Sequence, residues 1–175
     1  AHNIVVEGAD GLATELGHIK VADPQHGRLC GCGEHGCLEA YASGRHLPEL
    51  LREQVRAGKP SPLYEAHRDD LTALGADAID RAAAGGDAGA QALWDEVAER
   101  LGCAIGNVVT VFNPRVLVLG GGVMNSAPRL RQAVTQKLRS YAARPAQTHL
   151  QVEETRLGDD SGIIGAAYLA LQATP

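Results

Sequence analysis

The chain has 175 residues, enough for one globular domain with a hydrophobic core of its own and too few for two. Its composition is 45% hydrophobic and 21% charged, as in ordinary soluble proteins, and its formal net charge of -5 without a basic stripe argues against direct nucleic-acid contact by this segment. No apolar run approaches the roughly 18 residues of a membrane span and no signal peptide opens the chain, so we expect a cytoplasmic protein without membrane contact.

The first 38 residues predict a short strand, a turn and a compact loop. The apolar run 4–6 has strand character, and the glycines within 8–11 favour a turn after it. A strand so close to the start needs partners, so we expect the chain to begin within a domain. Residues 27–38 hold four glycines among three cysteines, a composition that predicts a loop rather than a helix or strand.

Helices are predicted from residue 39 onward. Apolar residues recur at helical spacing from Leu38 to Val55, and Pro48 either breaks this stretch or begins a second helix in its first turn. Residues 58–72 contain one glycine and two prolines, and we expect them to form a loop that leads into another helix. That helix covers 76–84 and ends at two glycines.

The second half of the chain alternates helices and strands. Asp87 is a plausible N-cap for a long helix that ends before Pro114. The apolar run 116–119 predicts a strand buried on both faces, and a helix is expected to begin near Asn125. The later elements are a helix, a strand and a helix, at 128–141, 148–155 and 161–171. This order is typical of an α/β fold.

Cysteine spacing gives the strongest chemical signal. Three of the four cysteines lie within eight residues, at Cys30, Cys32 and Cys37. Thiolates are good zinc ligands, and glycines between them let the backbone aim three sulfurs at one point. A fourth ligand must come from elsewhere, and the nearby histidines are His18, His26 and His35. The alternatives are free thiols in a loop or, in an oxidising compartment, disulfides.

Two carboxylates flank this cluster. Glu15 lies three residues before His18, and Glu39 lies two residues after Cys37. If zinc holds Cys37 and a nearby histidine, it also holds both carboxylates on a rigid support, where they suit hydrogen bonding to neighbouring hydroxyls such as those of a sugar. Without the zinc, each is an ordinary surface glutamate or an acid at a helix N-terminus.

Glycine-rich turns follow both predicted late strands. Gly120, Gly121 and Gly122 allow a flat or phosphorylated ligand to approach the backbone, although the spacing is not that of a dinucleotide or phosphate loop. A plain turn from strand to helix is the alternative. The segment 158–162 is similar, with Ser161 or Asp160 as the helix-capping residue in its simpler interpretation.

Other reactive residues predict no site. Cys103 falls on the apolar face of a helix and is expected to be a small buried hydrophobe. No Ser-His-Asp arrangement is supported by spacing, and three further histidines are expected on the surface or in loops: His46, His67 and His149.

These motifs together resemble those of ROK proteins, the family of repressors, open reading frames and sugar kinases. The segments that carry the resemblance are Glu-Leu-Gly-His at 15–18, the cysteine motif at 30–39, Asn-Pro at 113–114, the glycine segment at 118–123 and the closing segment at 158–167. The resemblance covers nearly the whole chain. It implies an actin-like (ribonuclease H-like) α/β ATPase lobe, usually in dimers, with an inserted zinc-binding loop at 18–37.

The resemblance also implies roles for individual residues. A structural zinc ion would be held by one histidine and three cysteines: His18, Cys30, Cys32 and Cys37. The sugar would be gripped by Glu15, His18 and Glu39, so that His18 gives one ring nitrogen to the metal and the other to the sugar. The adenosine of ATP, arriving with Mg²⁺, would lie against Gly120, Gly121 and Gly122.

Two departures from the family pattern stand out. ROK kinases usually have glycine before the first of these glutamates, where this chain has Thr14. They also have an N-terminal lobe with an Asp-x-Gly-Gly-Thr phosphate loop and a catalytic aspartate, and neither occurs here. We therefore expect residues 1–175 to form a single domain, the C-terminal lobe of such a protein, with the N-terminal lobe absent.

The function that the resemblance implies is that of an ATP-dependent hexose kinase. Glucose is the first expected substrate, with N-acetylglucosamine or N-acetylmannosamine next, and the chain alone is expected to be inactive. The alternative is the effector-sensing domain of a sugar-responsive transcriptional repressor of the same family. A sugar-binding remnant without either activity is a third possibility.

Overall fold

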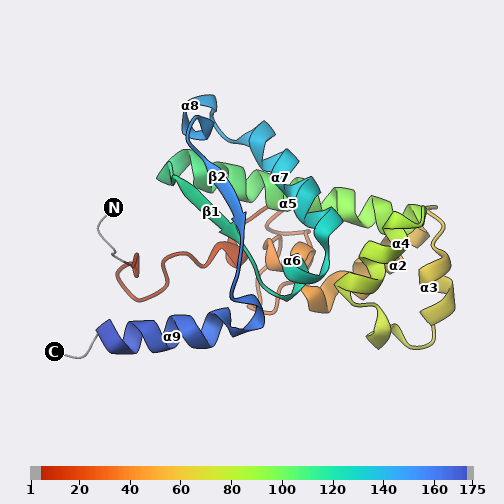
Figure 1. Cartoon of the computed structure of the whole chain (residues 1–175). Coiled ribbons are helices and arrows are strands. Elements are labelled where there is room, and N and C mark those ends of the chain that lie inside the picture. The colour runs from red at the N-terminus through yellow and green to blue at the C-terminus, as the bar shows by residue number, and fades with distance from the viewer. Residues whose placement is uncertain (1–4, 173–175) are drawn as a thin grey trace.

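A computed structural model of the chain describes residues 5–172 (Figure 1). Its helices are α1 (Glu39–Ala42), α2 (Leu47–Arg56), α3 (Pro62–His67), α4 (Ala76–Ala84), α5 (Ala88–Phe112), α6 (Gly122–Ser126), α7 (Pro128–Tyr141), α8 (Arg144–Gln147) and α9 (Ser161–Gln172). Its strands are β1 (Val116–Leu119) and β2 (Gln151–Glu154). Four 3₁₀ turns lie at Leu16–His18, Gly44–His46, Leu71–Ala73 and Gly158–Asp160.

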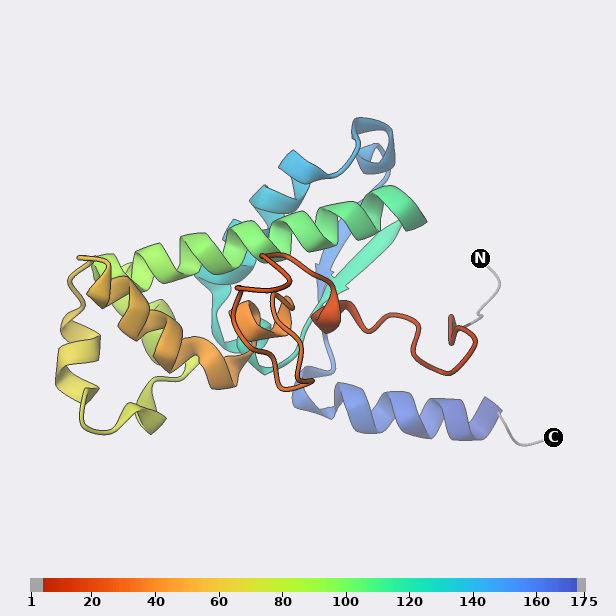
Figure 2. The same cartoon turned by 180° about the vertical axis from the view of Figure 1, so that it is seen from behind.

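Helix α5 is the longest helix among the described residues, and α1, α2, α4, α7 and α8 pack against it (Figures 1 and 2). Asp87 caps its start, as predicted, because the side chain accepts a hydrogen bond from the backbone N–H of Ala90. The helix ends at Phe112, and its C-cap residue, Asn113, has a left-handed φ of 45° immediately before Pro114. A capped start and a proline stop therefore fix both ends.

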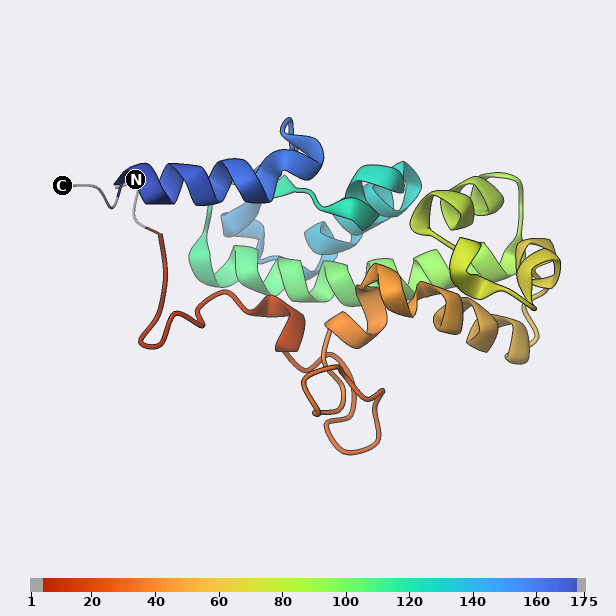
Figure 3. The ribbon, with the colours of Figure 1, turned by 90° about the horizontal axis from the view of Figure 1, so that it is seen from below.

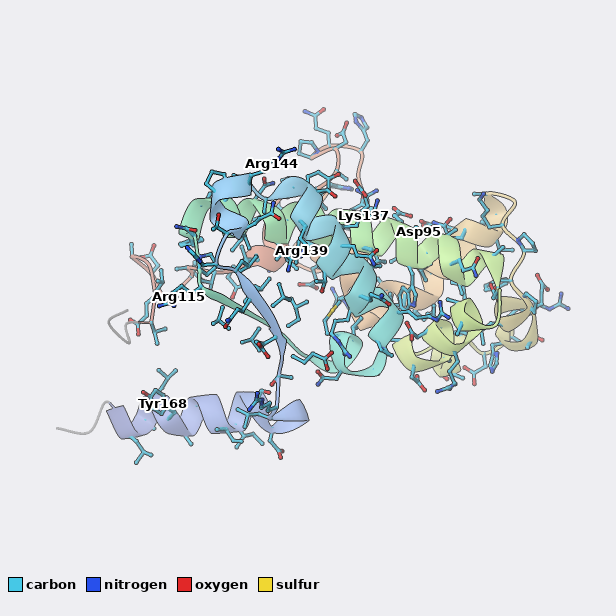
Figure 4. The ribbon with its side chains drawn as sticks, turned by 45° about the horizontal axis from the view of Figure 1, so that its top comes forward. Asp95, Arg115, Lys137, Arg139, Arg144 and Tyr168 are labelled. Atoms are coloured by element: carbon cyan, nitrogen blue, oxygen red, sulfur yellow. The ribbon has the colours of Figure 1, made fainter. Side chains whose placement is uncertain are left out.

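Helices α5 and α7 approach one another closely. A Cβ added at Gly102 would lie 2.3 Å from Cβ of Lys137, and one at Gly106 would lie 2.6 Å from Cβ of Tyr141. Lys137, on α7 (Figure 4), pairs with Glu99 of α5, with Nζ 2.6 Å from the carboxylate. Two glycines one turn apart thus remove the side chains that would hold the helices further apart.

The main hydrophobic core lies where α2, α4 and α7 meet α5. Its fully buried aliphatic side chains include Leu47, Leu50, Leu51, Ile79, Leu93, Val97, Leu130 and Val134. Aliphatic residues fill this core because the chain has few aromatic residues. Apolar surface removed from water contributes about 25 cal/mol per Å² to the stability of such a core.

A buried aspartate joins three of these helices. The side chain of Asp80, on α4, is 6% exposed and accepts hydrogen bonds from the Trp94 indole at 2.9 Å and from the backbone N–H of Leu130 at 3.3 Å. Leu130 lies in the first turn of α7, whose own N-cap residue, Ala127, offers no side-chain acceptor. Asp80 therefore satisfies the start of a helix that lies fifty residues further along the chain.

The two strands form a parallel pair, with Val116 opposite Gln151 and Leu119 opposite Glu154. The intervening helices make this a β-α-β unit, which confirms the α/β class. The prediction that 116–119 is buried on both faces is wrong for this chain. Leu117 and Leu119 face the helical core, but Val116 and Val118 are 49% and 57% exposed because no described element covers that face.

Two further predictions need correction. Ile4 lies outside the described residues, and Val5 and Val6 have irregular backbone without a strand partner, although Gly8 and Gly11 adopt the left-handed conformation expected of the turn. The loop predicted at 58–72 contains helix α3, because the Ser61 hydroxyl accepts a hydrogen bond from Tyr64 and caps its start.

Helix α9 stands apart from the helical body and extends away from the core (Figures 1 and 3). Its aliphatic side chains lie in solvent, with Ile163 74% and Leu171 77% exposed. Within residues 5–172, no helix has the length and hydropathy needed to cross a bilayer.

We expect Gly102→Ala to lower the free energy of unfolding by about 1–3 kcal/mol, because the new methyl group meets backbone and Cβ atoms of α7 that cannot move cheaply. The better helix propensity of alanine, worth about 1 kcal/mol, offsets only part of this cost. Urea denaturation measures the change. Gly165→Ala in α9 is the matched control, since nothing lies within 4 Å of its added Cβ, and a stable Gly102→Ala protein would contradict close α5–α7 packing.

Candidate functional site

A strained turn carries the first candidate sugar ligand. Glu15 has φ -67° and ψ 57°, the geometry of an inverse γ-turn, and the Leu16 N–H closes it onto the Thr14 carbonyl at 2.6 Å. Thr14 has a φ of 73°, which is rare for a β-branched residue. A glycine at this position would adopt this conformation without steric cost.

The cysteine loop, residues 18–37, folds back on itself through two isolated antiparallel bridges. Lys20 pairs with Cys37, and Leu29 pairs with His35. Gly36 has a φ of 77°, and a Cβ there would lie 2.6 Å from the Ala22 carbonyl oxygen. Glycine is therefore required where the two sides of the loop touch, which agrees with the loop predicted for 27–38.

The loop gathers four candidate metal ligands. The ligand atoms of His18, Cys30, Cys32 and Cys37 all lie within 4.8 Å of one another. The sulfurs of Cys32 and Cys37 are 3.8 Å apart, as are the Cys30 sulfur and Nδ1 of His18. Tetrahedral zinc with Zn–S bonds of about 2.3 Å requires sulfurs about 3.8 Å apart. Three thiols and one imidazole at this spacing fit a zinc ion.

The other two histidines that the sequence left open lie elsewhere. Nδ1 of His35 is 2.7 Å from the Gly27 carbonyl oxygen, and His26 lies 3.5 Å from the Asp23 carboxylate with its side chain 80% exposed. Neither belongs to the cluster of four, so the geometry favours His18 as the fourth candidate ligand.

The thiols of the cluster differ in their surroundings. The backbone N–H of Glu34 holds the pKa of the exposed Cys32 thiol below its ordinary value, whereas burial raises the pKa of Cys37. Metal ligation requires thiolates, and burial disfavours the thiolate form of Cys37.

Helix α5 anchors this loop through Arg100. The guanidinium donates to the Val21 carbonyl at 2.9 Å and lies 4.0 Å from the centre of the Tyr41 ring, a cation–π contact. The Tyr41 hydroxyl accepts a hydrogen bond from the backbone N–H of Arg28. One side chain of the core helix thus holds both sides of the loop.

The three candidate sugar ligands converge beside the loop. Nε2 of His18 is 3.8 Å from the Glu15 carboxylate, while its Nδ1 faces the Cys30 sulfur. Glu39 begins α1, and its Oε2 lies 3.8 Å from where a Cβ of Gly17 would be. The two ring nitrogens of His18 therefore face the cysteine cluster and the Glu15 carboxylate separately.

Arg45 is a residue of this site that the sequence reasoning missed. It donates to Oε1 of Glu39 at 3.0 Å, and its Nη2 would be 2.3 Å from a Cβ at Gly31 in the cysteine loop. It also donates to His46, whose pKa is lowered by burial and by the Arg45 and Arg28 charges, so the ring is neutral and able to accept. Arg45 lies six residues after Glu39, and no spacing rule marks that contact.

The glycine segment after β1 presents open backbone. Gly120 packs against Thr155, but Gly121 and Gly122 have nothing within 4 Å of an added Cβ, and Gly121 has a φ of 93°. α6 begins at Gly122, earlier than the predicted Asn125. At the second turn, the Ser161 hydroxyl donates to the Gly158 carbonyl oxygen at 2.6 Å.

Cys103 is less buried than predicted. It is only partly buried and lines a cavity of about 370 Å³ between α5, the end of α7 and residues 19–21. Its sulfur lies 3.8 Å from the Asn107 amide, one helical turn away. Cys103 faces this cavity because Gly102 and Ala104, its neighbours, take the positions that pack inward.

A model of the ROK family matches residues 1–173. The chain belongs to the ROK family. A glucokinase of Halalkalibacterium halodurans is 34% identical to this ROK chain over 175 residues, which cover 98% of the chain and 52% of that protein. An N-acetyl-D-glucosamine kinase of Pectobacterium carotovorum is 33% identical over 174 residues, covering 95% and 52%. The chain thus spans about half the length of the curated relatives it matches.

Solved structures of both functional classes resemble the ROK chain. A ROK family glucokinase from Streptomyces griseus, in complex with glucose and AMPPNP, gives a TM-score of 0.81 at 31% identity and covers 98% of this chain and 55% of that one. A ROK family transcriptional regulator, a homolog of the E. coli Mlc protein, gives 0.75 at 32% identity, covering 95% and 40%. Family membership therefore does not by itself separate kinase from repressor.

We expect the purified ROK chain to retain stoichiometric zinc after dialysis and Cys37→Ser to lose it, because the remaining ligands cannot close the tetrahedron and structural zinc contributes to folding. Metal analysis and thermal unfolding measure both effects. Cys103→Ser, which changes a cysteine outside the cluster, should keep its zinc. Full zinc content in Cys37→Ser would show that the ligand set is wrong.

Proposed function

We propose that this chain is the sugar- and nucleotide-binding lobe of an ATP-dependent hexose kinase with an actin-like (ribonuclease H-like) fold. A second lobe, outside residues 1–175, would complete the enzyme. The observation that carries the proposal is the orientation of His18: one ring nitrogen faces the cysteine cluster and the other faces a carboxylate. Such a histidine can join a structural metal site to a hydroxyl-binding site.

In this proposal, three side chains grip and orient the hexose. The carboxylates of Glu15 and Glu39 accept hydrogen bonds from sugar hydroxyls, and Nε2 of His18 faces the same space. Arg45 occupies Oε1 of Glu39 and leaves its other oxygen for the ligand. Zinc, when bound, would stiffen the loop that carries these groups without taking part in the chemistry.

The nucleotide would lie against the open backbone of Gly121 and Gly122, with Mg²⁺ arriving on ATP. Val123, on the same short helix, comes within 3.4 Å of a Cβ added at Gly44, which follows α1. The contact between Val123 and Gly44 therefore connects the glycine segment to the helix that begins with Glu39. Phosphoryl transfer depends mostly on positioning and on charge stabilisation, so this connection suits a kinase.

Exposed apolar surface supports a second lobe. Val116 and Val118 line the uncovered face of β1, and Tyr168 of α9 is 52% exposed (Figure 4). Apolar patches of this kind mark surfaces that another part of a protein covers. The relatives, which are about twice as long as this chain, have the additional sequence to do so.

The second candidate is the effector-sensing domain of a sugar-responsive repressor. The similarity to a ROK transcriptional regulator supports it, and such a domain would use the same sugar ligands with the sugar as signal rather than substrate. Nucleotide binding separates the two, because a repressor does not require it.

We expect the full-length protein to phosphorylate glucose with ATP and Mg²⁺, and residues 1–175 alone to show no turnover, because the catalytic base and phosphate loop would lie in the second lobe. A coupled ADP-release assay and calorimetry with AMPPNP test this. Sugar binding without nucleotide binding by the full-length protein would favour the repressor. Turnover by residues 1–175 alone would contradict the two-lobe proposal.

We expect Glu39→Gln in the full-length protein to raise the KM for glucose at least about tenfold, since a charge-assisted hydrogen bond contributes about 1.5–3 kcal/mol. Steady-state kinetics give the KM. The control is Glu65→Gln on α3, a surface carboxylate paired with Arg68 and outside the candidate site. An unchanged KM in Glu39→Gln, with zinc retained, would remove Glu39 from the sugar site.

A further inference from the structure

Lys20 lies against the cysteine cluster, although it belongs to none of the motifs. Its Nζ donates to the Cys37 sulfur at 3.3 Å and to the His35 carbonyl oxygen at 2.8 Å. We propose that Lys20 is a positioning residue of the metal site: its ammonium group balances the charge of the zinc–thiolate centre and sets its affinity for zinc. This inference rests on the metal site proposed above.

Backbone pairing places the Lys20 side chain beside the Cys37 sulfur. Lys20 and Cys37 face each other in an antiparallel bridge, flanked by hydrogen bonds from Val21 N–H to the Gly36 carbonyl and from Leu38 N–H to the Ile19 carbonyl. The two side chains therefore leave paired positions of a short ladder. Because the backbone of Lys20 is already held in this bridge, little backbone conformational entropy is lost when its side chain contacts the sulfur.

The positive charge of Lys20 would offset the negative charge of a zinc–thiolate centre. Three thiolates and a neutral imidazole around Zn²⁺ carry a net charge of about -1. Cys37 is completely buried, so water cannot stabilise its share of that charge. The Lys20 side chain is 37% exposed, with its Nζ on the sulfur. Its positive charge brings the sum for the ion, the ligands and Lys20 to about zero.

A surface ion pair is the competing explanation for the position of Lys20. Its Nζ also lies 3.7 Å from the Glu34 carboxylate, whose side chain is 71% exposed. Exposed pairs of this kind contribute little to stability. The two explanations differ in one respect: removing Glu34 would disturb the ion pair and leave the hydrogen bond to the sulfur intact.

The test measures zinc affinity of residues 1–175 by competition with a chromophoric chelator. Lys20→Met, which keeps the length of the side chain without its charge, should weaken zinc binding about tenfold or more, as other lost partners of metal ligands do. Lys20→Arg should lose less, because it retains the charge. Glu34→Gln should bind zinc as the wild type does. Cobalt(II) spectra of each protein report whether the tetrahedral thiolate geometry is preserved.

Each outcome decides the matter. Weaker binding by Lys20→Met, with a tetrahedral cobalt spectrum and an unaffected Glu34→Gln, supports the proposal. Wild-type affinity in Lys20→Met overturns it, as does an equal loss in Glu34→Gln, which would assign the effect to the ion pair. A cobalt spectrum changed in Lys20→Met alone would make Lys20 a determinant of the fold rather than of charge balance.

A wild-type chain that binds no zinc would overturn the metal site as well, whereas failure at Lys20 alone would leave the sugar-kinase proposal standing.

Discussion

The convergence of one imidazole and three thiols within 4.8 Å is the constraint on which the candidate site depends. It joins a turn near the start of the chain to the residues that lead into α1. Glu15 lies three residues before His18, and Glu39 lies two residues after Cys37, so neither carboxylate can move far while the cluster holds. With zinc bound, this loop would acquire the rigidity that binding groups need.

The helical core positions the cysteine loop. α5 holds it through Arg100, and α5 itself is fixed by close contact with α7 and by the buried carboxylate of Asp80. Asp80 also stabilises the start of α7, so the same helices that form the core set the position of the loop. Core packing and buried hydrogen bonds therefore fix α5, and α5 in turn positions the loop that carries the candidate site.

Much of this could be predicted from the sequence, since the signals were local. The N-cap at Asp87, the cysteine loop and its three thiols follow from residue type and spacing, whereas His18 as the fourth candidate ligand came from the family resemblance. The family assignment is confirmed. Local sequence signals could not predict features that depend on tertiary contacts. The exposure of Val116 depends on what covers the sheet, and the contacts of Arg45 and Lys20 depend on how a loop folds over itself.

The strand predicted at Val5 and Val6 failed for a similar reason. β propensity describes a side chain that fits a sheet, and these residues have no neighbouring strand among those described. α3 was missed because Ser61 and Pro62, which punctuate loops, also start helices.

Thr14 has a consequence for how readily the site assembles. A β-branched residue in the left-handed region costs about 1–2 kcal/mol that glycine would not incur. Such a difference changes the population of a local conformation by a factor of about 5–30. The turn that presents Glu15 is thus populated less often, before any ligand arrives, than the same turn built on glycine. Two proteins with identical contact residues could therefore differ in apparent affinity through this single backbone angle.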